Sequence, residues 1–330
     1  MTTTVWIVVG ALLSGVATRA FLTLARTRGW GKAVRQDGPD AHLAKAGTPT
    51  MGGVAFLAVA LAAGLVAALG VGPVRPGGAG LGTATALLAL VAASAALGAW
   101  DDLGALARKA RPGEDAATGV LARWRILAQT GVGLAFGAWA VAQGHTMVGL
   151  PALDVAGFAF VVVGSVNALN FTDGLDGLAA GVAAVILLAF LHDPFAAALL
   201  GALLGFAWFN AHPARVFMGG VGSEALGAAI AGLAIVHGDV WRLPLLAAVP
   251  VAEVLSVVEF RLDLVVDALG PGFRLRLDLG GERVADLELL EELLALVREV
   301  AGEVLVDPDG TLPLRGSGVR LLVAVSHTGG

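Results

Sequence analysis

Long apolar runs, separated by short polar connections, fill most of the chain up to about residue 258. A helix that spans a membrane needs about 20 mainly apolar residues. Nine segments approach this pattern, at 4–24, 51–71, 82–100, 126–143, 153–170, 178–191, 195–209, 224–238 and 241–258. We therefore predict an all-α polytopic membrane protein with about nine transmembrane helices, in which the short sixth and seventh segments can form one hairpin. No basic leader precedes the first segment, so we expect it to remain as a span rather than to be cleaved as a signal peptide.

The pattern of apolar residues changes near Glu259. Residues 273–279 alternate apolar and polar side chains, which is typical of a strand, and residues 287–301 combine helical spacing with many helix-forming residues. Two further strand-like runs, separated by a Pro-Asp-Gly turn signal, follow at 303–307 and 319–325. The pattern predicts a small β-α-β-β segment at the end of the chain.

Composition agrees with a membrane protein and supports a domain boundary. Of the 330 residues, 57% are hydrophobic and 14% are charged, whereas a soluble domain is roughly a quarter charged. The mean hydropathy is +0.83. Residues 1–258 carry 14 Lys or Arg against 13 Asp or Glu, and residues 259–330 carry 7 against 13. We therefore predict a membrane-embedded domain at 1–258 and an acidic cytoplasmic tail at 259–330.

The composition also excludes some kinds of site. The chain has no cysteine, so disulfides and thiolate metal sites are ruled out. No basic patch is interleaved with aromatic residues, so we expect no nucleic-acid binding.

The positions of Lys and Arg predict the orientation, because cytoplasmic connections carry an excess of both. These residues gather in the connections after the first, third and seventh segments, and the other side has only Arg75 and Arg242. The N-terminus is therefore expected outside, and the odd-numbered connections and the C-terminus in the cytoplasm.

One polar stretch stands between two apolar runs, with the sequence Asn167-Ala-Leu-Asn170-Phe-Thr-Asp173-Gly-Leu-Asp176-Gly177. Ionisable groups at or inside a bilayer are costly and are functional candidates by default. Asn167, Asn170 and Asp173 follow one another at intervals of three, so a helical turn would place them on one face. The alternative is a polar loop between two helices.

Three other polar motifs fall on the same predicted cytoplasmic face: Lys45-Ala-Gly-Thr48-Pro-Thr50-Met-Gly-Gly53, Asp101-Asp102 and Asn210-Ala-His212-Pro-Ala-Arg215. Adjacent carboxylates repel, so the Asp pair implies a cation or a raised pKa, and Mg²⁺ prefers carboxylate and phosphate oxygens. Glycine N–H groups and Thr hydroxyls near a helix start suit anion contact. Each motif also has a structural alternative: an exposed acidic pair, an ordinary membrane-entry loop, or a hydrogen-bonded structural histidine.

The convergence of carboxylate, basic and hydroxyl groups on one membrane face predicts phosphoryl chemistry on a lipid substrate. A transporter would also cluster polar groups, but at mid-membrane depth and in discontinuous helices. Here the polar groups stand at helix ends, so we rank the transporter last.

These motifs closely resemble those of the phospho-N-acetylmuramoyl-pentapeptide-transferase family, a branch of the polyprenyl-phosphate N-acetylhexosamine-1-phosphate transferases. The resemblance covers about residues 1–258 and includes Asp37-Gly-Pro39, His42 and the segments 45–53, 101–102, 167–177 and 209–219. It implies transfer of phospho-MurNAc-pentapeptide from its UDP-linked donor to undecaprenyl phosphate, giving lipid I and UMP. It also implies Mg²⁺ as cofactor and the bacterial inner (cytoplasmic) membrane as location. The chain has 47 Gly, which permits close helix packing and leaves a homodimer as one arrangement.

The resemblance implies roles for individual residues. Asp101 and Asp102 would handle the lipid phosphate and the metal, with Asp173 as a third catalytic residue. Arg125 stands where a lysine is expected, which keeps the charge but changes the geometry. Substrate binding is expected of Lys45, Thr48, Thr50, Asn167, Asn170, Asp176, Asn210, His212 and Arg125.

Two departures from the family pattern open alternatives. The family motif is Met-Gly-Asp-x-Gly-Ser, and this chain has Gly220 in place of the metal-binding Asp. Glu224, one helical turn further on, is the candidate replacement ligand. The family's histidine-rich loop and tenth span are also absent from 260–330, where the only histidine is His327. The alternatives to an active transferase are therefore a catalytically impaired paralogue that binds or regulates, and a related N-acetylhexosamine-1-phosphate transferase.

Overall fold

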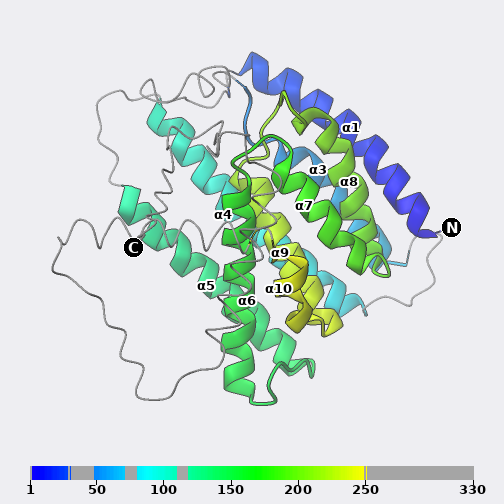
Figure 1. Ribbon diagram of the computed structural model, residues 1–330, viewed down its shortest axis with the longest axis vertical. Coiled ribbons are helices and arrows are strands. Elements are labelled where there is room, and N and C mark those ends of the chain that lie inside the picture. The colour runs from blue at the N-terminus through cyan, green and yellow to red at the C-terminus, as the bar shows by residue number, and fades with distance from the viewer. Residues whose placement is uncertain are drawn as a thin grey trace, which may run out of the picture. The chain divides into compact units, whose positions relative to one another are not determined.

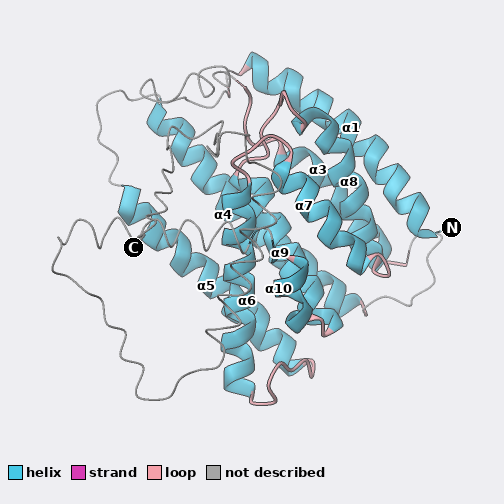
Figure 2. Ribbon diagram, in the orientation of Figure 1, coloured by secondary structure: helices cyan, strands magenta, loops and turns pink. Residues whose placement is uncertain are grey.

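The computed structural model describes residues 2–28, 30, 48–70, 80–109, 118–248 and 250. In this part of the chain every regular element is a helix and no strand occurs (Figures 1 and 2). The helices are α1 (Thr2–Thr27), α3 (Gly53–Ala68), α4 (Leu81–Lys109), α5 (Thr118–Ala142), α6 (Pro151–Thr172), α7 (Leu178–Leu187), η1 (Leu188–Phe190), α8 (Pro194–Asn210), α9 (Gly220–His237), η2 (Val240–Arg242) and α10 (Leu243–Leu246).

These helices confirm the all-α polytopic membrane fold. Four of them, α1, α4, α6 and α9, are long and apolar enough to cross a membrane, and α3, α7 with η1, and α8 are shorter apolar helices. The predicted segments 178–191 and 195–209 form α7 and α8, which pack against each other as the hairpin interpretation expects. The number of nine spans stays a prediction, because the last segment, 241–258, runs beyond the described residues. The tail at 259–330 also lies outside them.

Helix α9 lies at the centre of the bundle. Every residue from 221 to 235 is buried, and α9 contacts α3, α4, α6 and α7. Apart from Ser223 and Glu224 these residues are apolar or glycine, and a helix that is apolar on nearly all sides belongs in a protein interior. The N-terminus of α9 is therefore held in place by neighbours on several sides.

Glycines let the backbones meet at this N-terminus. A Cβ atom added to Gly98 of α4 would overlap the carbonyl group of Gly220, and one added to Gly53 would overlap the backbone of Gly222. Only residues without side chains allow so close an approach. The first turns of α3 and α9 and the second half of α4 are thereby brought together.

Two carboxylates make hydrogen bonds at the other end of the bundle, away from the start of α9. Asp193 caps α8, with its Oδ1 accepting the N–H of Phe195 at 2.8 Å and its Oδ2 3.1 Å from Nε2 of His237. Asp154 accepts the N–H groups of Met147 and Val148 at 3.0 and 2.7 Å. These contacts hold the connections at the end of the bundle that does not carry the four polar motifs.

Candidate active site

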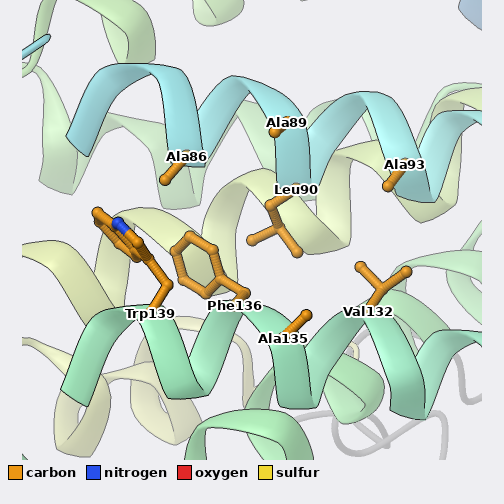
Figure 3. Close-up of a pocket in the computed structure, with 8 residues that line it drawn as sticks. All are labelled: Ala86, Ala89, Leu90, Ala93, Val132, Ala135, Phe136 and Trp139. Carbon is orange, nitrogen blue, oxygen red and sulfur yellow. The ribbon is translucent and has the colours of Figure 1, made fainter. Parts of the chain in front are cut away.

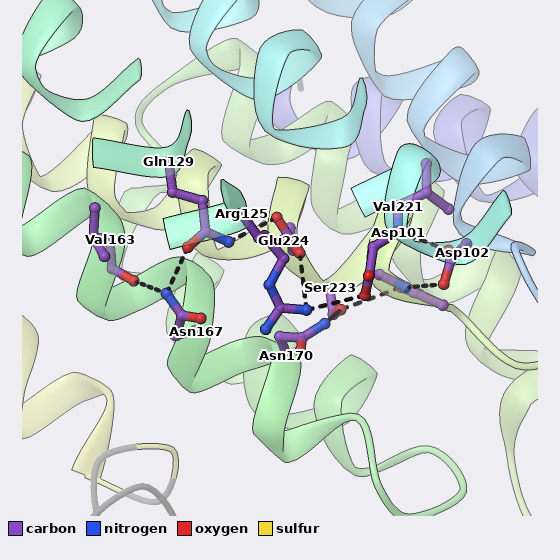
Figure 4. Close-up of polar contacts among 12 residues, drawn as sticks. Asp101, Asp102, Arg125, Gln129, Val163, Asn167, Asn170, Val221, Ser223 and Glu224 are labelled. Carbon is purple, nitrogen blue, oxygen red and sulfur yellow. Dashed lines mark hydrogen bonds and ion pairs between the residues drawn. The ribbon is translucent and has the colours of Figure 1, made fainter. Parts of the chain in front are cut away.

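Polar side chains from four helices meet at one end of the bundle (Figure 4). They come from the C-terminal third of α4, the first half of α5, the last two turns of α6 and the first turn of α9. Because these helices alternate in direction, motifs that are far apart in the sequence lie at the same end of the bundle. The residues involved are Asp101, Asp102, Arg125, Gln129, Asn167, Asn170, Ser223 and Glu224.

Asp102 caps the N-terminus of α9. Its Oδ1 accepts the N–H of Gly220 and its Oδ2 accepts the N–H of Val221, both at 3.1 Å. The first N–H groups of a helix have no partner within the helix and carry its positive dipole end. A carboxylate at this point is therefore stabilised, and α4 is tied to α9.

Arg125 links an exposed carboxylate to a buried one. Its Nη1 is 3.0 Å from Oδ2 of Asp101 and 3.9 Å from Oε1 of Glu224. The side chain of Asp101 is 41% exposed, that of Arg125 is 22% exposed, and that of Glu224 is fully buried. A buried charge is tolerated when it is paired and hydrogen-bonded, and Arg125 supplies the opposite charge.

A chain of amides holds Glu224 from the other side. Nε2 of Gln129 donates to Oε2 of Glu224 at 3.0 Å, and Nδ2 of Asn167 donates to Oε1 of Gln129 at 2.9 Å. Sequence reasoning did not single out Gln129, although it follows Arg125 by four residues inside an apolar run and so shares its helix face. Its position and its bond show that it belongs to the cluster.

Asn170 contacts the same turn of α9 through Ser223. Its Nδ2 donates to Oγ of Ser223 at 3.0 Å, and Oγ donates to the carbonyl oxygen of Gly219 at 3.2 Å. Asn167 and Asn170 thus share one face of α6, as their spacing predicts. Asp173 follows as the C-cap residue of α6, with its N–H bonded to the carbonyl oxygen of Leu169.

The Gly-Thr-rich motif runs beside the entry to α9. The N–H of Phe217 donates to the carbonyl oxygen of Pro49 at 2.8 Å, and the N–H of Gly52 donates to that of Phe217 at 2.9 Å. This pairing places Thr48 and the buried Thr50 next to the start of α9. Lys45, the first residue of the motif, lies outside the described residues.

The remaining motif residues shape the connection between α8 and α9. Oδ2 of Asp176 is 3.0 Å from Nδ1 of His212 and accepts the N–H of Ala214 at 3.1 Å. Nδ2 of the buried Asn210 donates to the carbonyl oxygen of Val216 at 2.9 Å. Of these side chains, His212 is mainly exposed, so it is the one best placed to meet a soluble substrate.

The donor set suits a divalent cation only in part. Among the described residues, no group of three or more His, Asp or Glu side chains is arranged to hold a metal ion. Mg²⁺ is usually bound by one or two carboxylates together with substrate phosphates. Asp101 and Asp102 supply two carboxylates, of which Asp102 already accepts two N–H groups of α9 and Asp101 is paired with Arg125. Glu224 fits less well, because it is fully buried and held by Gln129 and Arg125.

Gly220 lies next to the carboxylates that could bind a cation. A Cβ atom added there would be 3.4 Å from Oδ1 of Asp102 and 3.2 Å from the carbonyl oxygen of Gly98. An aspartate at this position would therefore begin beside Asp102, where two carboxylates can share one cation. The chain has a glycine there instead.

Comparisons with known proteins show which family the chain resembles. Residues 84–238 match the profile of glycosyl transferase family 4, and residues 45–57 match signature 1 of phospho-N-acetylmuramoyl-pentapeptide-transferase. The chain is 44% identical over 262 residues to the phospho-N-acetylmuramoyl-pentapeptide-transferase of Deinococcus radiodurans, covering 76% of this chain and 81% of the relative. It is 46% identical over 258 residues to that of Deinococcus deserti, with the same coverage, and 38% identical over 275 residues to that of Thermosynechococcus vestitus, covering 77% and 68%.

Proposed function

The chain belongs to the phospho-N-acetylmuramoyl-pentapeptide-transferase family, and from this we propose that it transfers phospho-MurNAc-pentapeptide from its UDP carrier to undecaprenyl phosphate, giving lipid I and UMP. The observation that carries the proposal is the meeting of Asp101, Asp102 and Arg125 at the N-terminus of α9. All three stand within residues 84–238, the range that matches the glycosyl transferase family 4 model. The protein is on this account a membrane-embedded phosphoglycosyl transferase of peptidoglycan synthesis.

The reaction joins two anions. An oxygen of the lipid phosphate attacks the phosphorus next to the sugar, a new P–O bond forms, and the P–O bond to UMP breaks with its electron pair leaving on UMP. Positioning and charge stabilisation supply most of the catalysis in phosphoryl transfer. Mg²⁺, when bound at Asp101 and Asp102, would neutralise phosphate oxygens.

Arg125 would contact the phosphates from inside the bundle. Its guanidinium group is planar with five N–H donors, and Nε makes no hydrogen bond among the described residues. Asp101 accepts a hydrogen bond from Nη1 at 3.0 Å, and Oε1 of Glu224 lies 3.9 Å from the same nitrogen without a hydrogen bond. We assign Glu224 to holding Arg125 rather than to binding the metal, which revises the interpretation from sequence.

The remaining groups would bind different parts of the two substrates. Lys45, Thr48 and Thr50 are assigned to phosphate, and Asn170, Asp173 and Asp176 to the nucleotide and diphosphate, with Asn167, Asn210 and His212 supporting the donor. The proposal includes the bacterial inner membrane, a cytoplasmic active site, an outside N-terminus, and a homodimer as the assembly to be tested. The 259–330 tail would then be a cytoplasmic segment.

Release of UMP by the purified protein in detergent tests the proposal. The donor would be UDP-MurNAc-pentapeptide and the acceptor undecaprenyl phosphate, each with and without Mg²⁺. We expect Mg²⁺-dependent release that needs both substrates and is lost in Asp101→Asn. Release that does not depend on the acceptor would contradict the proposal.

Gly220 favours one alternative, a paralogue that binds the donor without turning it over. It predicts measurable donor affinity and no UMP release, with turnover appearing in Gly220→Asp. A related sugar donor is the other alternative, and UDP-N-acetylglucosamine in the same assay separates it.

A further inference from the structure

Two side-chain amides, one on α5 and one on α6, form a chain of hydrogen bonds that runs in one direction (Figure 4). Nδ2 of Asn167 donates to the carbonyl oxygen of Val163 at 2.8 Å and to Oε1 of Gln129 at 2.9 Å. Nε2 of Gln129 in turn donates to Oε2 of Glu224 at 3.0 Å. The chain therefore has a backbone carbonyl at one end and a carboxylate at the other.

The two ends of this chain set the direction of the bonds between them. A backbone carbonyl oxygen and an ionised carboxylate only accept hydrogen bonds. Val163 therefore requires the N–H side of Asn167, and Glu224 requires the N–H side of Gln129. Gln129 then turns its oxygen toward Asn167, where the second N–H of Nδ2 meets it. Reversing either amide would bring two N–H groups or two oxygens together.

Gln129 is shielded from water, so these partners decide its orientation. The residue is 3% exposed, and it is the last buried polar residue of α5 among those that the structure describes. Beyond it the same face of the helix is apolar, and Val132 and Phe136 line a pocket there with Leu90 of α4 (Figure 3). A polar group in such surroundings is costly to leave unpaired, which holds the chain in its direction.

Asn167 keeps one group for a substrate, its amide oxygen. Because both of its N–H groups are used, Oδ1 lies on the side away from Gln129 and Val163 (Figure 4). The side chain is half-buried and lies one helical turn before Asn170, which contacts the first turn of α9. An amide oxygen accepts from an N–H or O–H group and repels a phosphate oxygen. Asn167 is therefore built to accept a hydrogen bond from an uncharged group.

We propose that Gln129 is a positioning residue of the active site, which accepts from Asn167 and so presents Oδ1 of Asn167 to an N–H or O–H group of the UDP-linked donor. The inference rests on the proposed function, which places the donor at this cluster. The uracil ring, the ribose and the amino sugar carry such groups, whereas the ionised diphosphate does not. Asn170, whose Nδ2 donates once, to Ser223, still has an N–H for the diphosphate.

Variants at position 129 test the positioning role through donor affinity. Gln129→Met removes the oxygen that Asn167 needs and keeps the length of the side chain. Gln129→Glu combined with Glu224→Gln keeps an acceptor toward Asn167, because the amide now at 224 donates to the carboxylate now at 129. Isothermal titration of the full-length protein in detergent with UDP-MurNAc-pentapeptide gives Kd. We expect Gln129→Met to raise Kd about tenfold and the double variant to stay within about twofold of the unchanged protein.

The melting temperature separates positioning from packing. A purely structural role predicts that Kd follows the melting temperature across these variants, and that result would overturn the proposal. We expect Kd to follow the presence of an acceptor at position 129 instead. Gln129→Glu alone supplies the same acceptor if the double variant fails to fold. Thr130→Val is the matched control, because the hydroxyl of Thr130 bonds to the carbonyl oxygen of Ile126 in its own helix, and it should leave Kd unchanged.

Ligands that lack one group identify the partner of Asn167. Kd is measured for uridine monophosphate and its 3-methyl, 2′-deoxy and 3′-deoxy forms, and for UDP with and without the muramoyl-pentapeptide, in the unchanged protein and in Asn167→Leu. Removing the group that bonds to Oδ1 should cost about tenfold in the unchanged protein and almost nothing in Asn167→Leu. Uridine against uridine monophosphate tests the phosphate in the same way. Coupling to the phosphate alone, or to none of the groups, would overturn the proposal.

Donor affinity and turnover separate this inference from the proposed function. Donor affinity that depends on an acceptor at position 129, without UMP release, would support the positioning role and contradict the transferase. UMP release with a donor KM that does not depend on position 129 would support the transferase and contradict the positioning role.

Discussion

Neutralising Glu224 should disable the active site although this side chain is completely buried. The change Glu224→Gln keeps the shape of the side chain, and its amide oxygen can still accept from Gln129. It removes the negative charge that stands 3.9 Å from Nη1 of Arg125. Arg125 then has Asp101 as its remaining ion-pair partner among the described residues.

The expected size follows from the contact. Two unit charges 3.9 Å apart interact by about 4 kcal/mol at an effective dielectric constant of 20. Breaking a buried pair by neutralising one partner costs about 3–5 kcal/mol. If the misplaced Arg125 raises the free energy of the transition state by about 2 kcal/mol of this amount, kcat/KM falls about thirtyfold.

The assay is UMP release at saturating donor, with the acceptor and Mg²⁺ varied separately. We expect Glu224→Gln to lower kcat/KM for the acceptor while the Mg²⁺ concentration for half-maximal rate stays unchanged, because we assign Glu224 to holding Arg125 rather than to binding the metal. Excess Mg²⁺ should not restore the rate.

A double-mutant cycle isolates the pair. Unfolding of Glu224→Gln, Arg125→Gln and the double variant should show a coupling free energy of about 1–3 kcal/mol. Asp154→Asn is the control for the loss of a buried carboxylate, because Asp154 lies at the other end of α6. It should lower stability without changing kcat/KM for the acceptor.

A variant Glu224→Gln with a normal rate at high Mg²⁺ and a tenfold higher Mg²⁺ requirement would refute this reasoning and make Glu224 a metal ligand.

Three further predictions follow from the geometry. Gly220→Asp adds a carboxylate beside the existing pair, so it should lower the Mg²⁺ concentration for half-maximal rate severalfold and make the melting temperature depend on Mg²⁺; an unchanged Mg²⁺ titration would contradict this. Gly98→Ala should lower the melting temperature and UMP release, because its Cβ would overlap the carbonyl group of Gly220, whereas Gly131→Ala, with open space around it, should change neither; equal effects would contradict the close approach of α4 and α9. Burial lowers the pKa of His145 from 6.5. As the pH falls through that value, the unfolded chain therefore binds more protons than the folded chain, and the free energy of unfolding should fall. Thermal unfolding from pH 8 to pH 5 checks this: we expect a weaker pH dependence in His145→Gln, and an identical dependence would contradict the reasoning.

The helices could be predicted from sequence because apolar periodicity is a local property. The predicted spans before residue 240 each coincide with a helix, from α1 at Thr2–Thr27 to α9 at Gly220–His237. The polar cluster could be predicted because a membrane protein has few reasons to carry Asp101, Asp102 and Asn170 at helix ends. That expectation needed only the order of apolar and polar segments.

Partner choice within the cluster could not be predicted, because it depends on how helices cross. Nothing in the sequence pairs Arg125 with Glu224, which are 99 positions apart, or shows that Gln129 lies between Glu224 and Asn167. The interpretation of Glu224 as a metal ligand used its spacing from Gly220 alone. Its burial and its partners, which only the fold reveals, favour the role of holding Arg125.

The most direct test of the central claim is the lipid product itself. Purified protein in vesicles with undecaprenyl phosphate, UDP-MurNAc-pentapeptide and Mg²⁺ would be extracted and measured by mass spectrometry alongside UMP. The account predicts undecaprenyl-diphospho-MurNAc-pentapeptide in equal amount to UMP, and neither product in Asp101→Asn. Donor bound by the protein with no lipid-linked product under these conditions would contradict it.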